Sequence, residues 1–148
     1  MLSLASTSYK VGRDGDIRHT GEVEPQIVLA SSSPRRRDLL SQLGLEFDVA
    51  IPSVDEAVKI GEEADVYVQR LSVSKAFAAE GDAVLAADTC VVLDGEVFGK
   101  PGDLEKAETM LRSLSGNVHQ VMTGVTVKSS DRVFTKLVTT EVEFAPMT

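Results

Sequence analysis

The ten residues IVLASSSPRR, 27–36, are the most informative about the fold. Ile27–Ala30 is a short apolar run, which predicts a buried strand, and three serines then form a turn. Pro34 suits the first position of a helix, and Ser33 is a favoured N-cap residue. A strand, a turn and a helix in this order predict an α/β domain that opens with a βα unit.

Apolar residues at helical spacing predict three helices, over residues 34–43, about 63–80 and about 103–115. A glycine follows the first and the third, and glycine commonly ends a helix because it tolerates a positive φ. The residues expected to be buried are Leu39, Leu40 and Leu43 in the first helix, Ala64, Tyr67, Val68, Leu71 and Ala78 in the second, and Leu104, Ala107, Met110, Leu111 and Leu114 in the third.

Further segments have the alternation or the apolar character of strands. Asp94-Gly95, between two of them, is a strong signal for a two-residue β-hairpin. Strands and helices follow the order βαβ, αβ, hairpin, αβ, β, which predicts an α/β domain with a mixed, elongated sheet and flanking helices. The predicted strands are residues 45–51, 84–87 with its end at Asp88-Thr89, 91–93, 96–98, 121–127 and 133–144.

The composition excludes several classes of protein. A hydrophobic fraction of 43% with 26% charged residues is typical of a soluble globular domain, and no apolar run reaches the roughly 18 residues that span a bilayer. With 15 basic and 23 acidic residues, the net charge is −8, which disfavours binding to a nucleic acid polymer. The single cysteine, Cys90, permits no internal disulfide, so a reducing, cytoplasmic location is expected.

Residues 1–25 differ in character from the rest of the chain. They mix Gly, Ser, Thr and both signs of charge, and they lack the apolar segment of a secretory signal. We therefore interpret residues 1–25 as a flexible leader or a remnant of cloning, and residues 26–148 as the folded domain.

Two arginines at the start of the first helix break a local rule. Arg35 and Arg36 lie where free N–H groups and the positive end of the helix dipole favour anions. A phosphate bound by serine hydroxyls, backbone amides and both guanidinium groups would resolve the conflict. The alternative is a solvated basic patch, which is the interpretation that suits Arg37. Lys75 continues the inward stripe of the second helix, so its ammonium either reaches solvent or points into a cleft.

Carboxylates follow two of the predicted strands. Asp88 comes at the expected carboxyl end of a buried strand, where open α/β sheets place ligand-binding groups. It could activate water, hold a metal or simply cap a turn. Asp55-Glu56 could ligate a hard cation or be solvated. Lys100 lies in a Gly/Pro turn, and it could likewise belong to the site or be solvated. Because no serine or cysteine nucleophile has a paired base, metal-assisted attack of water on a polyphosphate fits these residues better than covalent catalysis.

These motifs, in this order, resemble the Maf family of nucleotide pyrophosphatases. The resemblance begins with LASSSPRR at 29–36 and extends over roughly residues 26–146. The other motifs are VDE at 54–56, KA at 75–76, ADT at 87–89, GKP at 99–101, LSG at 114–116 with His119, and TG at 123–124.

The resemblance implies a role for nine residues. Asp88 would accept a proton from the water that attacks the α phosphate, and Glu56 and Asp88 would hold the metal. The remaining positions would be Lys75 and Lys100 as catalytic cations, Ser31, Ser33 and Arg36 around the triphosphate, and Arg35 and Thr89 in base selectivity. PRR together with DT resembles the subgroup that acts on dTTP and UTP.

The implied reaction converts a nucleoside triphosphate and water to the monophosphate and pyrophosphate, with Mg²⁺ or Mn²⁺. The implied fold has two lobes around a cleft, as in inosine triphosphatases, and family members also form homodimers. The implied biological role is the removal of noncanonical or excess nucleotides, with a link to septum formation and cell division arrest.

Family members continue beyond the strand that here ends near Phe144, with a further helix, a loop and more core strands. We therefore expect the chain to lack the C-terminal part of its domain, or to receive the missing surface from a partner. The main rival to an active pyrophosphatase is a nucleotide-binding regulator with weak turnover, and a phosphate-binding hydrolase of broader range is a third hypothesis. Because Glu56, Lys75, Asp88 and Lys100 are all retained, the active enzyme is favoured.

Overall fold

A computed structural model gives the structure of the protein and describes residues 9–11, 17–19 and 25–147. Its elements are β1 (Tyr9–Val11), β2 (Ile17–His19), β3 (Ile27–Ala30), α1 (Pro34–Gln42), β4 (Asp48–Ala50), α2 (Ala64–Phe77), β5 (Ala83–Leu93), β6 (Glu96–Phe98), α3 (Leu104–Leu114), β7 (Val118–Ser129) and β8 (Val133–Glu143). Within the predicted leader, β1 and β2 pair antiparallel, and the other residues up to 24 lie outside the described residues.

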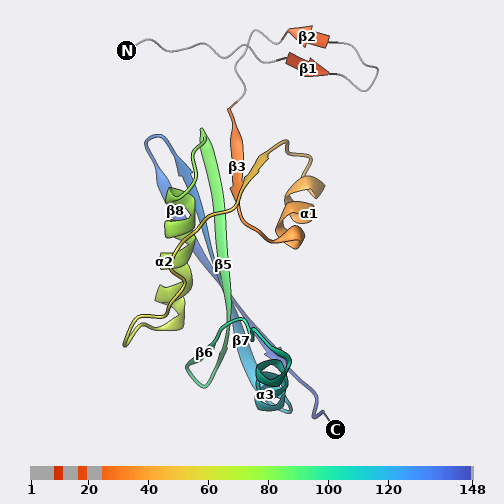
Figure 1. The fold of residues 1–148 in the computed structure, drawn as a ribbon, viewed down its shortest axis with the longest axis vertical. Coiled ribbons are helices and arrows are strands. Elements are labelled where there is room, and N and C mark those ends of the chain that lie inside the picture. The colour runs from red at the N-terminus through yellow and green to blue at the C-terminus, as the bar shows by residue number, and fades with distance from the viewer. Residues whose placement is uncertain (1–8, 12–16, 20–24, 148) are drawn as a thin grey trace.

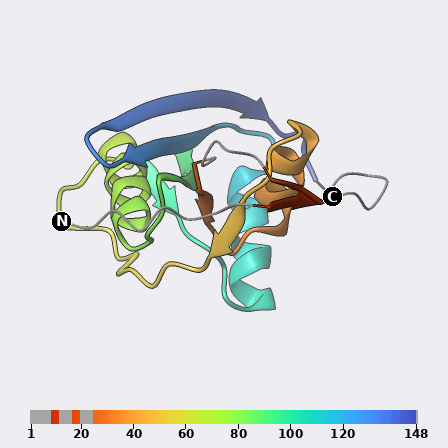
Figure 2. The same ribbon diagram turned by 90° about the horizontal axis from the view of Figure 1, so that it is seen from above.

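The sheet is mixed, and its order is β4-β3-β5-β7-β8, with β6 paired to β5 (Figure 1). β3 pairs in parallel with β4 and with β5, whereas β5, β7 and β8 pair antiparallel. The connection through α1 and the connection through α2 run in opposite directions along the sheet. Since such crossovers are right-handed, the two helices cover opposite faces. Figures 1 and 2 show α1 and α2 on opposite sides of β3, so the predicted α/β class is confirmed.

The core lies between α2 and the sheet. Gly124 of β7 allows the closest approach, because a Cβ added there would lie 2.5 Å from the carbonyl oxygen of Val68. Two buried clusters fill this layer: Val28, Ala30, Ala76, Ala79, Val84 and Ala86 form one, and Ala64, Tyr67, Val68, Leu71, Cys90 and Val92 form the other. α2 ends three residues earlier than predicted, so Ala78 caps the helix and is exposed rather than buried.

The prediction that a strand ends at Asp88-Thr89 is wrong. β5 continues through both residues to Leu93, because it pairs with β7 from Ala83 to Val92. β3, however, pairs with β5 only as far as Ala86. Asp88 therefore still lies just beyond the carboxyl end of a parallel strand, where α/β sheets form their ligand clefts.

Helix positions are close to those predicted, but several predicted buried faces are wrong. In α1 only Leu40 is buried, whereas Leu39 and Leu43 are exposed. In α3 Leu114 is buried, but the side chains of Leu104 and Leu111 are exposed. Periodicity identifies the apolar face of a helix, but burial requires another element over that face.

The shorter elements agree in part with the sequence. The strand predicted over 45–51 is reduced to Asp48–Ala50, because its partner β3 has only four residues. The hairpin at Asp94-Gly95 is confirmed, with φ values of 50° and 79° that suit a tight turn. Within the described residues, no helix combines the length and apolar character that a membrane crossing requires.

Candidate active site

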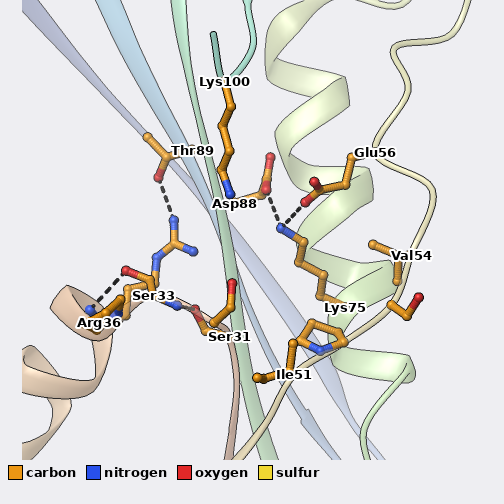
Figure 3. Close-up of a pocket in the computed structure, with 14 residues that line it drawn as sticks. Ser31, Ser33, Arg36, Ile51, Val54, Glu56, Lys75, Asp88, Thr89 and Lys100 are labelled. Carbon is orange, nitrogen blue, oxygen red and sulfur yellow. Dashed lines mark hydrogen bonds and ion pairs between the residues drawn. The ribbon is translucent and has the colours of Figure 1, made fainter. Parts of the chain in front are cut away.

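A cleft of about 730 Å³ opens where β3 ends and α1 begins (Figure 3). Five separate parts of the chain supply its walls: the turn after β3 with the start of α1, the loop after β4, the middle of β5, and single residues from α2 and from the loop after β6. The lining residues are Ser31, Ser32, Ser33, Pro34, Arg36, Ile51, Pro52, Ser53, Val54, Glu56, Lys75, Asp88, Thr89 and Lys100.

The serine turn orients hydroxyl groups at the start of α1. The Ser31 hydroxyl accepts a hydrogen bond from the Ser33 N–H at 3.1 Å, and the Ser33 hydroxyl caps the helix by accepting from the Arg36 N–H at 3.4 Å. Each hydroxyl oxygen is thereby fixed while its own hydrogen remains available. The turn can therefore present two O–H donors to an anion in the cleft.

Lys75 joins two carboxylates that are distant in the sequence. Its ammonium nitrogen lies 2.6 Å from Asp88 Oδ1 and 2.7 Å from Glu56 Oε1. Burial disfavours the charged form of Lys75, but the hydrogen bonds to Asp88 and Glu56 outweigh this and raise its pKa above the ordinary value. The ammonium is therefore charged at neutral pH and is the shared counter-ion of both carboxylates.

Glu56 is the more accessible of the two carboxylates. Its side chain is 50% exposed, compared with 11% for Asp88. The hydrogen bond from Lys75 lowers the pKa of Glu56, outweighing burial, and the charge of Lys100 acts in the same direction. Figure 3 shows the ammonium of Lys100 pointing toward Asp88. The hydroxyl of Tyr67 donates to the Glu56 carbonyl at 2.7 Å and so anchors the loop that carries the carboxylate.

Arg36 is fixed by β5 at the other side of the cleft. Its Nη1 donates to the carbonyl of Ala87 at 3.0 Å. Its Nη2 donates to the Thr89 hydroxyl at 3.0 Å, as Figure 3 shows. A guanidinium group carries five N–H donors, so further donors remain after these two bonds. Three cations and two carboxylates thus line one cleft in a chain whose net charge is −8. Such a cleft can attract a polyanion and hold a carboxylate base beside it.

Comparison with known proteins assigns the family. The profile described as "Maf-like protein" matches residues 26–148. This chain belongs to the Maf family. It is 51% identical over 127 residues to a dTTP/UTP pyrophosphatase of Anaeromyxobacter sp. (strain Fw109-5), covering 82% of this chain and 62% of that protein. It is 53% identical over 125 residues to a dTTP/UTP pyrophosphatase of Anaeromyxobacter dehalogenans (strain 2CP-C), covering 82% and 64%.

The Maf chain therefore spans less than two thirds of the length of these two relatives. A dTTP/UTP pyrophosphatase of Vibrio parahaemolyticus is 47% identical over 127 residues, with 82% of this chain and 67% of that protein covered. Among solved structures, the Staphylococcus aureus Ham1 protein is similar in fold, with a TM-score of 0.51 and 20% identity over 79% of this chain and 69% of that chain.

The structure brings most of the predicted Maf site residues together. Arg35 is the exception, because it is exposed on α1 and is not among the residues that line the cleft. Asp55 also lies apart, since its carboxylate caps the Ala57 N–H in an exposed turn. The predicted residues that do line the cleft are Ser31, Ser33, Arg36, Glu56, Lys75, Asp88, Thr89 and Lys100.

Two residues beside this candidate site received no site role from the sequence, although Thr123 belongs to the TG motif of the family resemblance. Tyr67 was expected in the buried stripe of its helix, and a tyrosine there signals a polar partner because its hydroxyl needs one. Thr123, in β7, contacts Thr89 at 2.9 Å between the two hydroxyl oxygens. Cys90, next to the site, has its pKa raised to about 11 by burial and by the charge of Asp88, so the thiol stays protonated.

Proposed function

We propose that the protein hydrolyses dTTP, UTP and related or modified nucleoside triphosphates to the monophosphate and pyrophosphate. The observation that carries this proposal is the position of Lys75 between Glu56 and Asp88, facing the serine turn across one cleft. The cations compensate the charge of a triphosphate, and the carboxylates supply a base and oxygen ligands. The bacterial relatives, which are named dTTP/UTP pyrophosphatases, support the same reaction class.

In this mechanism Asp88 accepts a proton from the water that attacks the α phosphorus. A new P–O bond forms to the water oxygen, the bond between the α phosphorus and the bridging oxygen breaks, and pyrophosphate leaves with the bond's electron pair. Lys75 and Lys100 offset the charge that develops on the phosphate oxygens. The hydroxyls of Ser31 and Ser33 donate to the triphosphate and fix its direction in the cleft.

The residues fit a divalent metal, Mg²⁺ or Mn²⁺. Both carboxylates already bind one cationic group, the Lys75 ammonium, at 2.6 and 2.7 Å. Mg²⁺ is commonly held by one or two carboxylates together with substrate phosphates and water, and Glu56 and Asp88 match this donor set. Within the described part of the chain there is no group of three or more His, Cys, Asp or Glu side chains placed to hold a metal. The ion would supply charge stabilisation and polarise a phosphate oxygen, and Lys75 would turn from the carboxylates to the phosphates when it binds.

The finer assignments follow the family resemblance. We propose dTTP and UTP as preferred substrates, a cytoplasmic location, a homodimer, and a role in septum formation and cell division arrest. We also propose that residues 26–148 are the nucleotide-binding domain and residues 1–25 a leader. Arg35 and Thr89 would act in base selectivity, although Arg35 would have to turn toward the cleft when a nucleotide binds.

The test is release of pyrophosphate by the 148-residue chain from dTTP, UTP, CTP and methylated GTP in the presence of Mg²⁺. We expect release from dTTP and UTP, and we expect Asp88→Asn to lower kcat by about 100-fold or more, because it removes the base while keeping the shape. Asp38→Asn on the exposed part of α1 is the matched control and should leave kcat unchanged.

Two results would overturn this proposal. A folded chain that binds UTP without releasing pyrophosphate would instead be the nucleotide-binding regulator. Unchanged turnover in Asp88→Asn would show that Asp88 is not the base that accepts a proton from the attacking water.

A further inference from the structure

The loop between β4 and α2 carries Glu56 into the cleft, but none of its side chains is buried. The structure describes every residue from 51 to 63, and each is exposed or half-buried. The apolar side chains of Ile51, Val58 and Ile60 are among the exposed ones. Because a loop with little apolar packing opens easily, polar contacts must hold Glu56 in place.

Arg70, on α2, binds this loop at two points. Its Nε donates to Glu62 Oε2 at 2.6 Å and its Nη2 donates to Glu62 Oε1 at 2.8 Å, which is the bidentate geometry of a strong ion pair. The same Nη2 donates to the Ala57 carbonyl at 3.0 Å. Glu62 Oε1 also accepts from the Lys59 N–H at 3.1 Å. One guanidinium group therefore joins the residue after Glu56 to the end of the loop.

Tyr67 lies one turn before Arg70 on α2 and holds the preceding carbonyl. Its hydroxyl donates to the Glu56 carbonyl at 2.7 Å, and the guanidinium carbon of Arg70 lies 5.7 Å from the centre of its ring. This distance is within the range of a cation–π contact, so each of the two side chains restricts the other. The carbonyls of Glu56 and Ala57 are thus both fixed, which sets the direction in which the Glu56 side chain leaves the backbone. That direction is toward Lys75, whose ammonium nitrogen lies 2.7 Å from Glu56 Oε1.

Arg70 does not belong to the cleft that it supports, because it is not among the lining residues. Its side chain is 24% exposed and that of Glu62 is 6% exposed, so solvent screens this ion pair less than it screens the exposed pair of Arg112 and Glu108 on α3. The pair has the shielding that a lasting tether needs, and Arg70 extends it to the peptide next to a carboxylate of the site.

We propose that Arg70 is a positioning residue for Glu56, which holds the loop through Glu62 and the Ala57 carbonyl so that the Glu56 carboxylate stays beside Lys75 in the cleft. The inference rests on the proposed function, because the position of Glu56 affects turnover only if this cleft hydrolyses a nucleotide. Arg70 itself does not touch the substrate. Its removal releases the loop, and the carboxylate then spends part of its time outside the cleft.

The test compares Arg70→Met with Arg112→Met. Methionine keeps the apolar stem without the guanidinium group, so kcat for UTP should fall about 10- to 100-fold in Arg70→Met, as for other groups that orient a metal-binding side chain. KM for UTP at saturating Mg²⁺ should stay within about twofold, because the serine turn and Arg36 are unchanged. Arg112→Met is the matched control, since Arg112 pairs with Glu108 on the exposed part of α3 and should leave kcat and KM unchanged.

Two measurements do not depend on turnover. In Arg70→Met the Lys59 amide should exchange with solvent about 10-fold faster or more, because Glu62 is no longer held to accept its hydrogen bond, whereas the amides of β5 should exchange at a rate close to that of wild type. The dissociation constant for Mn²⁺ alone, measured by electron paramagnetic resonance, should rise about 10- to 100-fold, because Glu56 is no longer held beside Asp88.

A double-mutant cycle separates positioning of Glu56 from a general structural role. In the Glu56→Gln background, Arg70→Met should cause no further fall in kcat, because Arg70 acts through the Glu56 carboxylate. Glu62→Gln is a second variant, which keeps the shape of the partner, weakens the ion pair and tests the tether if Arg70→Met does not fold. It should lower kcat by about 3- to 10-fold.

The outcomes distinguish this inference from the proposed function. Absence of pyrophosphate release by the wild-type chain would overturn the proposed function, and the exchange rate of Lys59 and the dissociation constant for Mn²⁺ would then serve as the readouts for the same variants. An unchanged exchange rate of Lys59 in Arg70→Met, unchanged kcat and Mn²⁺ affinity, or an equal fall in kcat with and without the Glu56 carboxylate would overturn the role of Arg70.

Discussion

Replacement of Lys75 by methionine tests the centre of the site most directly. Methionine retains most of the length and the apolar stem of lysine but removes the ammonium that lies 2.6 Å from Asp88 and 2.7 Å from Glu56. Removal of one partner from a buried ion pair costs about 3–5 kcal/mol, because the other charge is left uncompensated. The Glu56 side chain is half exposed, so solvent screens its interaction with Lys75. We therefore expect a loss of about 3 kcal/mol in the free energy of unfolding at pH 7, carried mainly by the Asp88 pair.

A divalent cation should reverse this loss. With Lys75 gone, the two carboxylates face a site that Mn²⁺ can enter without competition from the ammonium. Binding to the folded state alone stabilises a protein by about 2.7 kcal/mol when the ligand is at 100 times its dissociation constant. Mn²⁺ without nucleotide should therefore stabilise Lys75→Met more than wild type, although Lys75→Met should hydrolyse nucleotides poorly, because the phosphates lose a cation.

The assay is urea denaturation with and without Mn²⁺, together with Mn²⁺ binding measured by electron paramagnetic resonance. Lys106→Met is the matched control, since Lys106 pairs with Asp103 at 3.9 Å on an exposed surface and should change stability by less than about 0.5 kcal/mol. Equal stabilities of the two variants would show that Lys75 is not the counter-ion of Asp88. Equal affinities of wild type and Lys75→Met for Mn²⁺ would show that the carboxylates do not share one cation site.

Two further predictions concern the scaffold. The bidentate hydrogen bonds from Arg70 lower the pKa of Glu62 to about 2 from an ordinary 4.5, so the stability due to this pair is fully present above pH 4.5 and is lost as pH falls toward 2. An NMR titration should find this midpoint in wild type and a return toward 4.5 in Arg70→Met; a midpoint that does not move would assign the shift to another cause. Gly124→Ala places a Cβ 2.5 Å from the carbonyl oxygen of Val68 and should lower the free energy of unfolding by about 1–3 kcal/mol, whereas Gly99→Ala has no atom within 4 Å of the added Cβ; equal midpoints of urea denaturation would contradict the close packing of α2 on β7.

The sequence determined the features that depend on neighbours along the chain. Ser33 and Pro34 predict the start of α1, because an N-cap and a proline act within one turn. Asp94-Gly95 predicts the hairpin, because its positive φ values are a local preference. The apolar period of Ala64, Val68 and Leu71 similarly predicts the buried face of α2.

The sequence also contained the residues of the candidate site, but as separate motifs with open alternatives. Lys75 could have reached solvent, and Asp88 could have capped a turn. Lys75 lies in α2 and Asp88 lies in β5, and the packing of α2 on β5 brings these residues together although they are 13 positions apart. Glu56 joins them from a loop anchored by Tyr67. These distances, and the hydrogen bonds that turn Arg36 toward Thr89 while Arg35 stays exposed, are not present in any local pattern.

The end of β5 and the coverage of apolar faces depend on contacts between distant parts of the chain. Asp88-Thr89 resembles the end of a strand, yet pairing of Asp88 with Gly124 and of Thr89 with Thr123 extends β5 through both residues. Leu104 and Leu111 have the spacing of a buried face, but in the structure both are exposed. The physical reason is the same in each case: helix caps and turns are decided by a few adjacent residues, whereas strand length and burial depend on a partner from a distant part of the chain.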